Sequence, residues 1–388
     1  MTEKLFWKNA YETKFTAKVK AIKGDGIILD RTLFYPESGN QLSDKGYLEV
    51  KNFKVKIENV SKKGDEILHH IQSDFIEKFT IGDTIKGEID WNFRYGLMKA
   101  HSSQHIFSAV LKNKFNIDTV RAILNFEEVF LQISKKLNYN DLKRVLLEIN
   151  SICTSSSLEF SSKIITQKEA KNISSQIRSS IPDEHQVRLI EIHDLDLVCC
   201  GGTHVRYTNE IGNLFLYDFK KGNGIRYYIG TKALQMNSNI IVDLLEIASK
   251  INTPIAKFSE NVSKRLELLE NTQKLQKDLS IDYLELVSKN PLKIINKIPL
   301  YYIAFDIDIK ILNKKLGNFP PNSFIIVEKG NRKLRLLSAG ESADANEIMQ
   351  RLIKKFGGRG GGNSKSAQGV LEIIPKNIFA EIELLIKD

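Results

Sequence analysis

Residues 187–204, VRLIEIHDLDLVCCGGTH, place an apolar, β-branched segment a few residues before a thiol and an imidazole that are four residues apart. The segment 187–192 is typical of a strand. Cys200 and His204 are ligand types that Zn²⁺ prefers, and the two glycines between them allow a tight turn around an ion. Alone, this Cys-x-x-x-His pair is weak evidence for a metal site.

A second pair, His101-Ser-Ser-Gln-His105, lies about a hundred residues earlier. Apolar residues recur at helical spacing from residue 92 to 111, and Asp90 or Asn92 could cap this helix. Two histidines four residues apart share one face of a helix. Together with the Cys-x-x-x-His pair they predict a tetrahedral zinc site.

Other interpretations of these residues are weaker. Cys199 could replace Cys200 as the ligand, but its spacing to His204 is one residue longer. The His101 pair lacks the glutamate of the zinc metalloprotease motif, which disfavours peptide hydrolysis. Cys153 has no ligand partner nearby and is expected in the core.

The sequence around these motifs predicts an α+β protein with four segments. Residues 1–90 hold five or six short strands, typical of a small β-barrel. Residues 91–240 mix strands with helices and carry all four expected ligands. Residues 241–291 form a helical spacer, in which a heptad-like series from Ile255 to Leu286 is apolar at seven of ten positions. This series indicates a coiled coil and a homodimer, or a helix packed on its own chain.

Charge and composition narrow the class of partner. The 388-residue chain has a net charge of +10, and residues 289–388 contain 17 Lys plus Arg against 10 Asp plus Glu. This excess suggests a polyanionic partner. Three cysteines cannot form a disulfide framework, and we find neither a secretion signal nor 18 consecutive apolar residues. We therefore expect a cytoplasmic protein without membrane spans.

Three separated motifs resemble one family. The two ligand pairs and GIRYYIG (224–230) are similar to the editing domain shared by alanyl-tRNA synthetases and free-standing AlaX-type proteins. LDRTLFYPESGNQLSDKGYL (29–48) resembles the small barrel of that family. FGGRGGGNSKSAQG (356–369) resembles the glycine-rich signature of its C-terminal α/β DHH-associated domain, here expected at 292–388. Because the chain begins at the barrel, we expect a long-form AlaX-type protein without an aminoacylation domain.

The resemblance implies a zinc-dependent hydrolase that acts in trans on mischarged tRNA(Ala). It would cleave the ester at the acceptor end, chiefly of Ser-tRNA(Ala) and also of Gly-tRNA(Ala). The alternative is a non-catalytic, oligomeric tRNA-binding protein with a structural zinc. A DHH phosphodiesterase is disfavoured because the sequence has no Asp-His-His tripeptide.

The resemblance also assigns residues. Gln41 matches the glutamine of the family's glycine-rich turn and is the expected catalytic residue, although Ser38 and Asn40 stand where glycine is usual. Arg121, in Arg121-Ala122-Ile123, and Thr203 are expected to contact the amino acid. The last four residues expected to bind tRNA phosphates lie just before and within the glycine-rich segment, where a basic helix is expected to lead into flexible backbone. The expected phosphate-binding residues are Arg226, Arg351, Lys354, Lys355 and Arg359.

Overall fold

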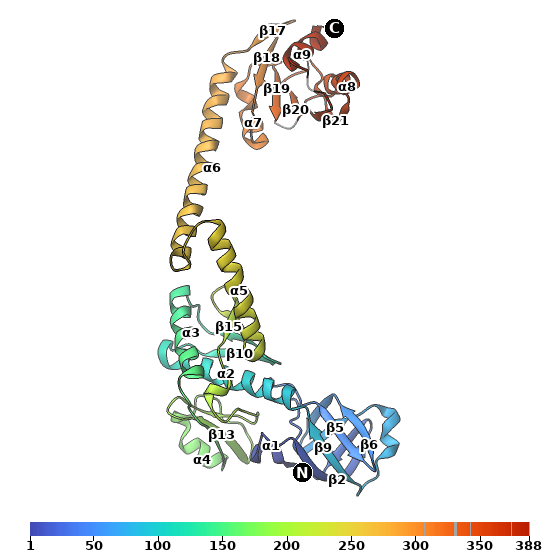
Figure 1. Ribbon diagram of the computed structural model, residues 1–388, viewed down its shortest axis with the longest axis vertical. Helices are drawn as coiled ribbons and strands as arrows, with labels where there is room; N and C mark the ends of the chain where they lie inside the picture. The colour runs from blue at the N-terminus through green and yellow to red at the C-terminus, as the bar shows by residue number, and fades with distance from the viewer. Residues whose placement is uncertain (306, 330–331, 342, 374, 388) are drawn as a thin grey trace. The chain divides into compact units, whose positions relative to one another are not determined.

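The computed structural model describes residues 1–305, 307–329, 332–341, 343–373 and 375–387 (Figure 1). The chain packs into two compact units, Met1–Ile247 and Ala248–Asp388. The first unit combines helices with several sheets and the second combines helices with one six-stranded sheet, which confirms the α+β class. Within the described ranges, no helix has the length and apolar character needed to cross a membrane. The division into four segments stays a prediction.

The N-terminal sheet has seven antiparallel strands in the order β6-β5-β9-β2-β3-β8-β7. Its strands are β2 (Lys14–Lys23), β3 (Gly26–Leu29), β5 (Gly46–Val50), β6 (Phe53–Ile57), β7 (Asn59–Lys63), β8 (Glu66–His70) and β9 (Thr84–Ile89). β1 (Glu3–Lys4) and β4 (Arg31–Thr32) form a separate parallel pair, and α1 spans Leu5–Lys8. A register shift between Val19 and Ala21 interrupts β2, the long strand that pairs with both β9 and β3.

The closed barrel expected for residues 1–90 is wrong. In the described part of the chain the sheet ends at β6 and β7, and these strands do not pair with each other. The segment between β4 and β5 does not form a long strand of this sheet. It is instead a loop, attached through Asp44 to Arg94 of the next segment.

The histidine pair lies on helix α2 (Trp91–Phe115), which matches the helix expected at 92–111. α2 packs on a four-stranded sheet of order β10-β11-β16-β15. A second sheet, of order β12-β13-β14, brings the cysteine to the same place. The strands are β10 (Thr119–Asn125), β11 (Glu128–Ile133), β12 (Phe160–Thr166), β13 (Gln186–Ile192), β14 (Asp196–Cys199), β15 (Phe215–Lys220) and β16 (Gly224–Tyr228).

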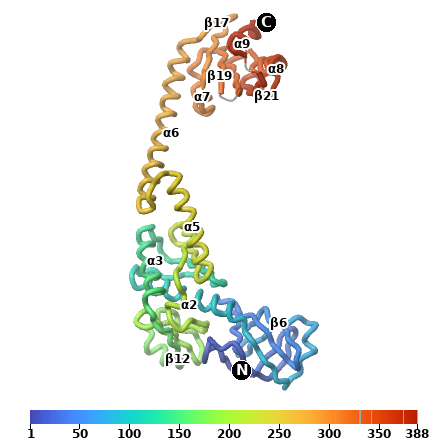
Figure 2. Tube along the Cα trace, viewed as in Figure 1, coloured from blue at the N-terminus to red at the C-terminus, as the bar shows by residue number. Residues whose placement is uncertain are grey.

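The remaining helices of this region are α3 (Tyr139–Thr154), α4 (Gln167–Asn172) and α5 (Gly230–Lys250). Buried residues of α2, α3 and the four-stranded sheet form one hydrophobic core, among them Phe107, Val145 and Tyr227. The tube in Figure 2 shows α2 running from the N-terminal sheet into this region. The histidines therefore lie on a rigid, buried element.

The second unit contains a six-stranded sheet with helices on both faces. In β19, Phe324 and Ile326 pack in the cluster with α8 and α9, whereas Ile325 and Val327 pack in the cluster with α6 and α7. The helices are α6 (Phe258–Ser288), α7 (Ile309–Lys315), α8 (Ala345–Phe356) and α9 (Ile378–Lys387). The strands are β17 (Lys293–Ile295), β18 (Ile298–Ile303), β19 (Phe324–Lys329), β20 (Lys333–Ser338), β21 (Gly358–Asn363) and β22 (Ser366–Leu371).

The glycine-rich segment is not the flexible backbone that we expected. β21 and β22 form an antiparallel hairpin at the edge of the sheet. Gly358 has a φ of +117°, and a Cβ at that position would overlap the carbonyl of Val370. Glycine here permits close pairing of two strands, which composition alone did not reveal.

Candidate metal centre

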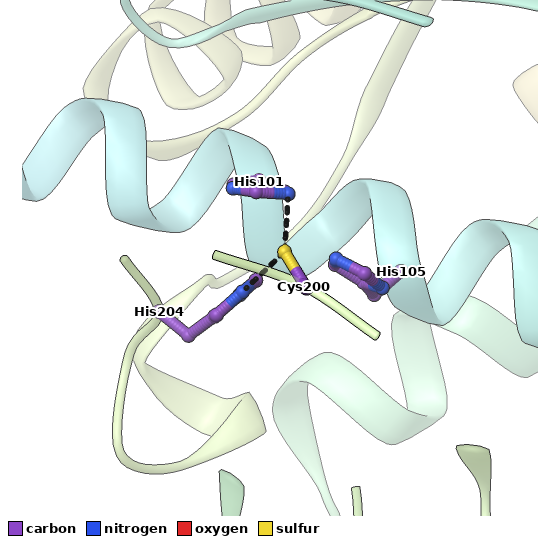
Figure 3. A group of neighbouring side chains, drawn as sticks. All are labelled: His101, His105, Cys200 and His204. Atoms are coloured by element: carbon purple, nitrogen blue, oxygen red, sulfur yellow. Dashed lines mark hydrogen bonds between the residues drawn. The ribbon is translucent and has the colours of Figure 1, made fainter. Parts of the chain in front are cut away.

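Helix α2 fixes the first two side chains of the candidate site. Asp90 caps the helix by accepting a hydrogen bond from the Phe93 amide at 3.1 Å. His101 and His105 follow one turn apart, both less than 7% exposed, with ring centroids separated by 4.9 Å. Their imidazoles lie on the side of α2 that faces the cysteine-bearing loop (Figure 3).

Cys200 and His204 come from the loop that follows β14. The Cys200 Sγ lies 3.4 Å from Nε2 of His101 and 3.4 Å from Nε2 of His204. One ligand atom from each of the four residues lies within 4.8 Å of the others. The fold thus brings together the two ligand pairs that are about a hundred residues apart in sequence (Figure 3).

Gln41 orients His101. Its Oε1 lies 2.8 Å from His101 Nδ1 and accepts a hydrogen bond from the Thr203 amide at 3.2 Å, while its Nε2 donates to Thr203 Oγ1 at 2.9 Å. With this amide orientation, Nδ1 of His101 carries the proton and Nε2 keeps its lone pair. A ligand histidine needs this tautomer to bind a metal through Nε2.

The other two imidazoles have different surroundings. Nδ1 of His204 lies 3.3 Å from the Ser102 hydroxyl. Both ring nitrogens of His105 are buried without a hydrogen-bond partner, although Nδ1 lies 3.9 Å from the Asp196 carboxylate. Arg178 holds that carboxylate through two hydrogen bonds of 2.6 and 2.7 Å. Burying a ring nitrogen without a hydrogen-bond partner destabilises the fold, and a bound metal ion would provide the missing partner for His105.

Burial decides the protonation of the cluster. Burial and, to a smaller extent, the cation of Arg188 lower the pKa of His101 to about 3. Burial also holds the pKa of His105 and His204 well below the ordinary value. In Cys200, burial raises the thiol pKa against the opposing effect of the Gly202 amide. The imidazoles are therefore neutral, as metal ligands must be.

The donor set and its spacing fit zinc. Bonds of about 2.0–2.3 Å to nitrogen and sulfur in a tetrahedron leave roughly 3.5 Å between ligand atoms, close to the separations of 3.4 Å around Cys200. Three imidazoles and one thiolate are borderline to soft donors, which disfavours Mg²⁺ and Ca²⁺. The cluster can hold one Zn²⁺.

A buried ion pair connects the Gln41 loop to α2. Arg94 donates through Nε to Asp44 at 2.7 Å and pairs with the same carboxylate through Nη2, and neither side chain is exposed. Arg94 also donates to the carbonyls of Ala10 and Leu33. The loop turns at Asn40, with a φ of 65°. These contacts hold Gln41 against the helix that carries the histidines.

Sequence reasoning missed Arg188 and Trp7. Arg188, on β13, donates to the carbonyls of Cys200 and Gly202 at 3.1 and 2.7 Å. Trp7, from α1, donates its indole N–H to the carbonyl of Gly201 at 2.8 Å. The signal for Arg188 was an arginine between the buried residues Val187 and Leu189 of a strand. Nothing near Trp7 in sequence pointed to residues almost two hundred positions away.

Two other expected site residues lie on strands of the four-stranded sheet. Arg121 is exposed on β10, whereas its neighbour Ala122 is buried, so the two side chains lie on opposite faces of the strand. Arg226, on β16, lies 3.8 Å from the Asp218 carboxylate. Its neighbour Tyr227 points to the core with α2, so Arg226 faces away from the histidines.

The expected tRNA-binding residues of the C-terminal segment belong to the second unit. Arg351 and Lys355 form ion pairs within that unit, at 2.7 Å with Glu347 and 2.5 Å with Glu381. Lys354, at the end of α8, and Arg359, at the start of β21, are exposed.

Two segments of the first unit match family models of known proteins. Residues 2–93 match the family model of class II (A) tRNA synthetases. Residues 187–226 match the model of the threonyl and alanyl tRNA synthetase second additional domain. These ranges include the Gln41 loop and the Cys200–His204 loop.

Related proteins match over longer ranges. Alanyl-tRNA editing protein AlaX-L of Pyrococcus horikoshii is 27% identical, over 98% of this chain and 97% of its own length. Alanine–tRNA ligase of Sulfurisphaera tokodaii is 29% identical over 93% of this chain, which spans only 41% of the ligase. The C-Ala domain of Aquifex aeolicus alanyl-tRNA synthetase, a crystal structure, is 21% identical over 24% of this chain and 94% of that domain, with a TM-score of 0.20. The full-length similarity to AlaX-L confirms the resemblance of this chain to the long-form AlaX-type alanyl-tRNA editing proteins.

Proposed function

We propose that this protein edits tRNA(Ala) by hydrolysing the ester that joins a wrong amino acid, chiefly serine and also glycine, to its 3′ end. The observation that carries the proposal is the group of four ligand side chains that two distant segments supply. The similarity to an alanyl-tRNA editing protein agrees with this function. Because tRNA is charged and used there, the proposed compartment is the cytoplasm.

The reaction requires only water. Its oxygen bonds to the acyl carbon, the bond from that carbon to the ribose oxygen breaks, and the ribose oxygen receives a proton. A zinc ion held by His101, His105, Cys200 and His204 would supply positive charge for anchoring the amino acid or polarising the ester carbonyl. An aminoacyl ester is already activated, so correct positioning contributes much of the remaining acceleration.

The protein groups around the ligands would act by positioning. Gln41 is buried and fully engaged by His101 and Thr203, so we assign it the role of fixing the His101 tautomer rather than direct catalysis. Thr203 is equally buried, and we assign it to the same network. Arg121, exposed on β10, remains our proposal for a contact with the aminoacyl end.

Other parts of the chain would bind the body of the tRNA. We propose phosphate contacts for the exposed or partly exposed cations named from the sequence, which are Arg226, Arg351, Lys354, Lys355 and Arg359. Several of them have carboxylate partners, which RNA phosphates would have to displace. A homodimer through α6 is part of the same proposal, since α6 exposes Leu269 and Leu279 of the heptad-like series.

The test is the release of serine, glycine and alanine from tRNA(Ala) charged with each. Wild-type protein is expected to release serine well above the rate without protein, and the double variant His101→Ala/His105→Ala is expected to lose that activity. Serine loss at the uncatalysed rate with the zinc-loaded wild type would reject the proposal.

One observation favours a second candidate, a tRNA-binding protein with a structural zinc. Four protein ligands close the tetrahedral shell, as in structural rather than catalytic zinc sites. That candidate predicts tRNA binding that depends on zinc, without any loss of the ester.

A further inference from the structure

Two cavities flank the ligand cluster in the first unit. One, of about 340 Å³, reaches Cys200 and Gly201, and the other, of about 290 Å³, reaches His204. Trp7 and Arg188 line both of them. Volumes near 300 Å³ suit a small ligand or one nucleotide unit. Any substrate that approaches the cluster through either cavity meets these two side chains.

In the part of the chain that the structure describes, no carboxylate neutralises the charge of Arg188. Nη1 donates to two backbone carbonyls, at 3.1 Å to Cys200 and 2.7 Å to Gly202, while the buried Nε has no hydrogen-bond partner. The thiolate form of Cys200 favours the Arg188 cation, but no carboxylate among the described residues pairs with it. A largely buried guanidinium whose Nε has no hydrogen-bond partner can donate to an anionic ligand.

Trp7 presents an aromatic surface beside this charge. Its indole N–H is fixed by the carbonyl of Gly201 at 2.8 Å, and the Arg188 guanidinium lies 6.0 Å from the ring centroid. Nζ of Lys4 lies 3.8 Å from the same centroid. The ring is only partly buried and borders both cavities. A planar group that stacks on it displaces the Lys4 ammonium from the ring face or uses the opposite face.

The lining of the two cavities has a net positive charge, although one of its cations, Lys8, pairs with Glu3 at 2.6 Å. Its only carboxylate is Glu184, which lies 3.9 Å from Lys62. The cationic side chains of the lining are Lys4, Lys8, Lys62, Arg188 and Arg206. Positive charge together with an aromatic face is the pattern by which proteins hold single-stranded nucleic acid.

We propose that Trp7 and Arg188 form a cradle for the 3′-terminal nucleotide of the tRNA acceptor end. The base stacks on the indole of Trp7, and the phosphodiester that precedes this nucleotide contacts Arg188. The aminoacyl ester on the terminal ribose is thereby held next to the ligand cluster. This inference rests on the proposed function, since it names how the substrate of that function is held.

The test uses full-length protein and an acceptor-stem minihelix with a non-hydrolysable 3′-serylamide. The matched probe lacks the terminal nucleotide. Wild-type protein is expected to bind the complete minihelix about ten-fold more tightly than the shortened one, as one base–aromatic stack allows. Trp7→Phe should keep most of this ratio, because Phe can stack. Trp7→Leu should lower this ratio several-fold, to the part contributed by the phosphodiester at Arg188 and by the serylamide, and an undiminished ratio in Trp7→Leu overturns the proposal.

A second experiment measures tryptophan fluorescence with Trp7 and Arg188 both unchanged. Trp91 is the only other tryptophan and stacks on Tyr95 at a centroid distance of 5.0 Å. In the Trp91→Phe protein, fluorescence therefore reports Trp7 alone. The complete minihelix should quench it and the shortened probe should not. Equal signals with both probes contradict stacking.

The contact with Arg188 is tested on the wild-type protein by replacing the last phosphodiester with a neutral methylphosphonate. Binding should weaken several-fold, and unchanged affinity would remove Arg188 from the cradle. These assays do not require hydrolysis. If binding depends on Trp7 but no serine is released, the cradle is supported and the deacylase function is rejected. If serine is released at a rate that Trp7→Leu does not change, the deacylase function is supported and the cradle is rejected.

Discussion

Gly202→Ala is expected to disrupt the metal centre through steric overlap. A Cβ on Gly202 would overlap the ring of His101 and lie 2.9 Å from Oε1 of Gln41, where ordinary contact begins at 3.4 Å. Gln41 must therefore move by about half an ångström, and the His101 ring by more. Overpacking of this kind costs roughly 1–3 kcal/mol. Losing the orientation of one ligand lowers metal affinity about 10- to 100-fold.

Gly201→Ala is the matched control, because a Cβ there meets only Trp7 Cζ2, at 3.8 Å. The assay is zinc retained per protein, measured by elemental mass spectrometry after dialysis against a graded series of chelator concentrations. Gly202→Ala should release zinc at 10- to 100-fold lower chelator activity than the wild type, and Gly201→Ala should follow the wild type. Identical release by the two variants would refute the steric argument.

Three further predictions concern buried side chains of the first unit. Asp44→Asn leaves the buried Arg94 charge unpaired and should cost roughly 3–5 kcal/mol of unfolding free energy, measured in urea by tryptophan fluorescence; a cost below about 1 kcal/mol would contradict it. Burial lowers the pKa of His69 to about 4, so the unfolded chain binds more protons. Stability should therefore fall by up to roughly 3 kcal/mol as pH drops from 6.5 to 4, and His69→Gln should reduce this fall. If the stability of His69→Gln depends on pH as strongly as that of the wild type, burial of His69 is not the cause of the fall. Gln41→Ala removes the acceptor that orients His101 and should weaken zinc binding about 10- to 100-fold in the chelator assay. Unchanged zinc binding in Gln41→Ala would show that Gln41 does not position His101.

The local elements around the ligands could be predicted from the sequence. Apolar spacing after the cap candidates Asp90 and Asn92 predicted α2, and the apolar, β-branched segment 187–192 predicted β13. Both signals depend on neighbours a few residues apart. The joint presence of two ligand pairs then predicted one shared metal site, and the folded chain brings their ligand atoms within 4.8 Å of one another.

Long-range contacts could not be predicted in this way. The hydrogen bond between Gln41 and His101 joins residues 60 positions apart in sequence, and the hydrogen bond from Trp7 to Gly201 joins residues 194 positions apart. No local pattern specifies either partner. Barrel closure failed for a related reason, since strand count alone does not determine which edges pair. The glycine-rich segment was mistaken for flexible backbone because glycine composition is shared by loops and by tightly paired hairpins.

The central claim is that one zinc held by His101, His105, Cys200 and His204 is required to hydrolyse the seryl ester of tRNA(Ala). The most direct measurement is the rate of serine release by zinc-loaded protein, by the same protein after chelation to below 0.1 zinc per chain (about one-tenth occupancy), and after zinc is restored. The rate should fall with the zinc content and return with it. A rate that persists in zinc-free, folded protein would contradict the claim.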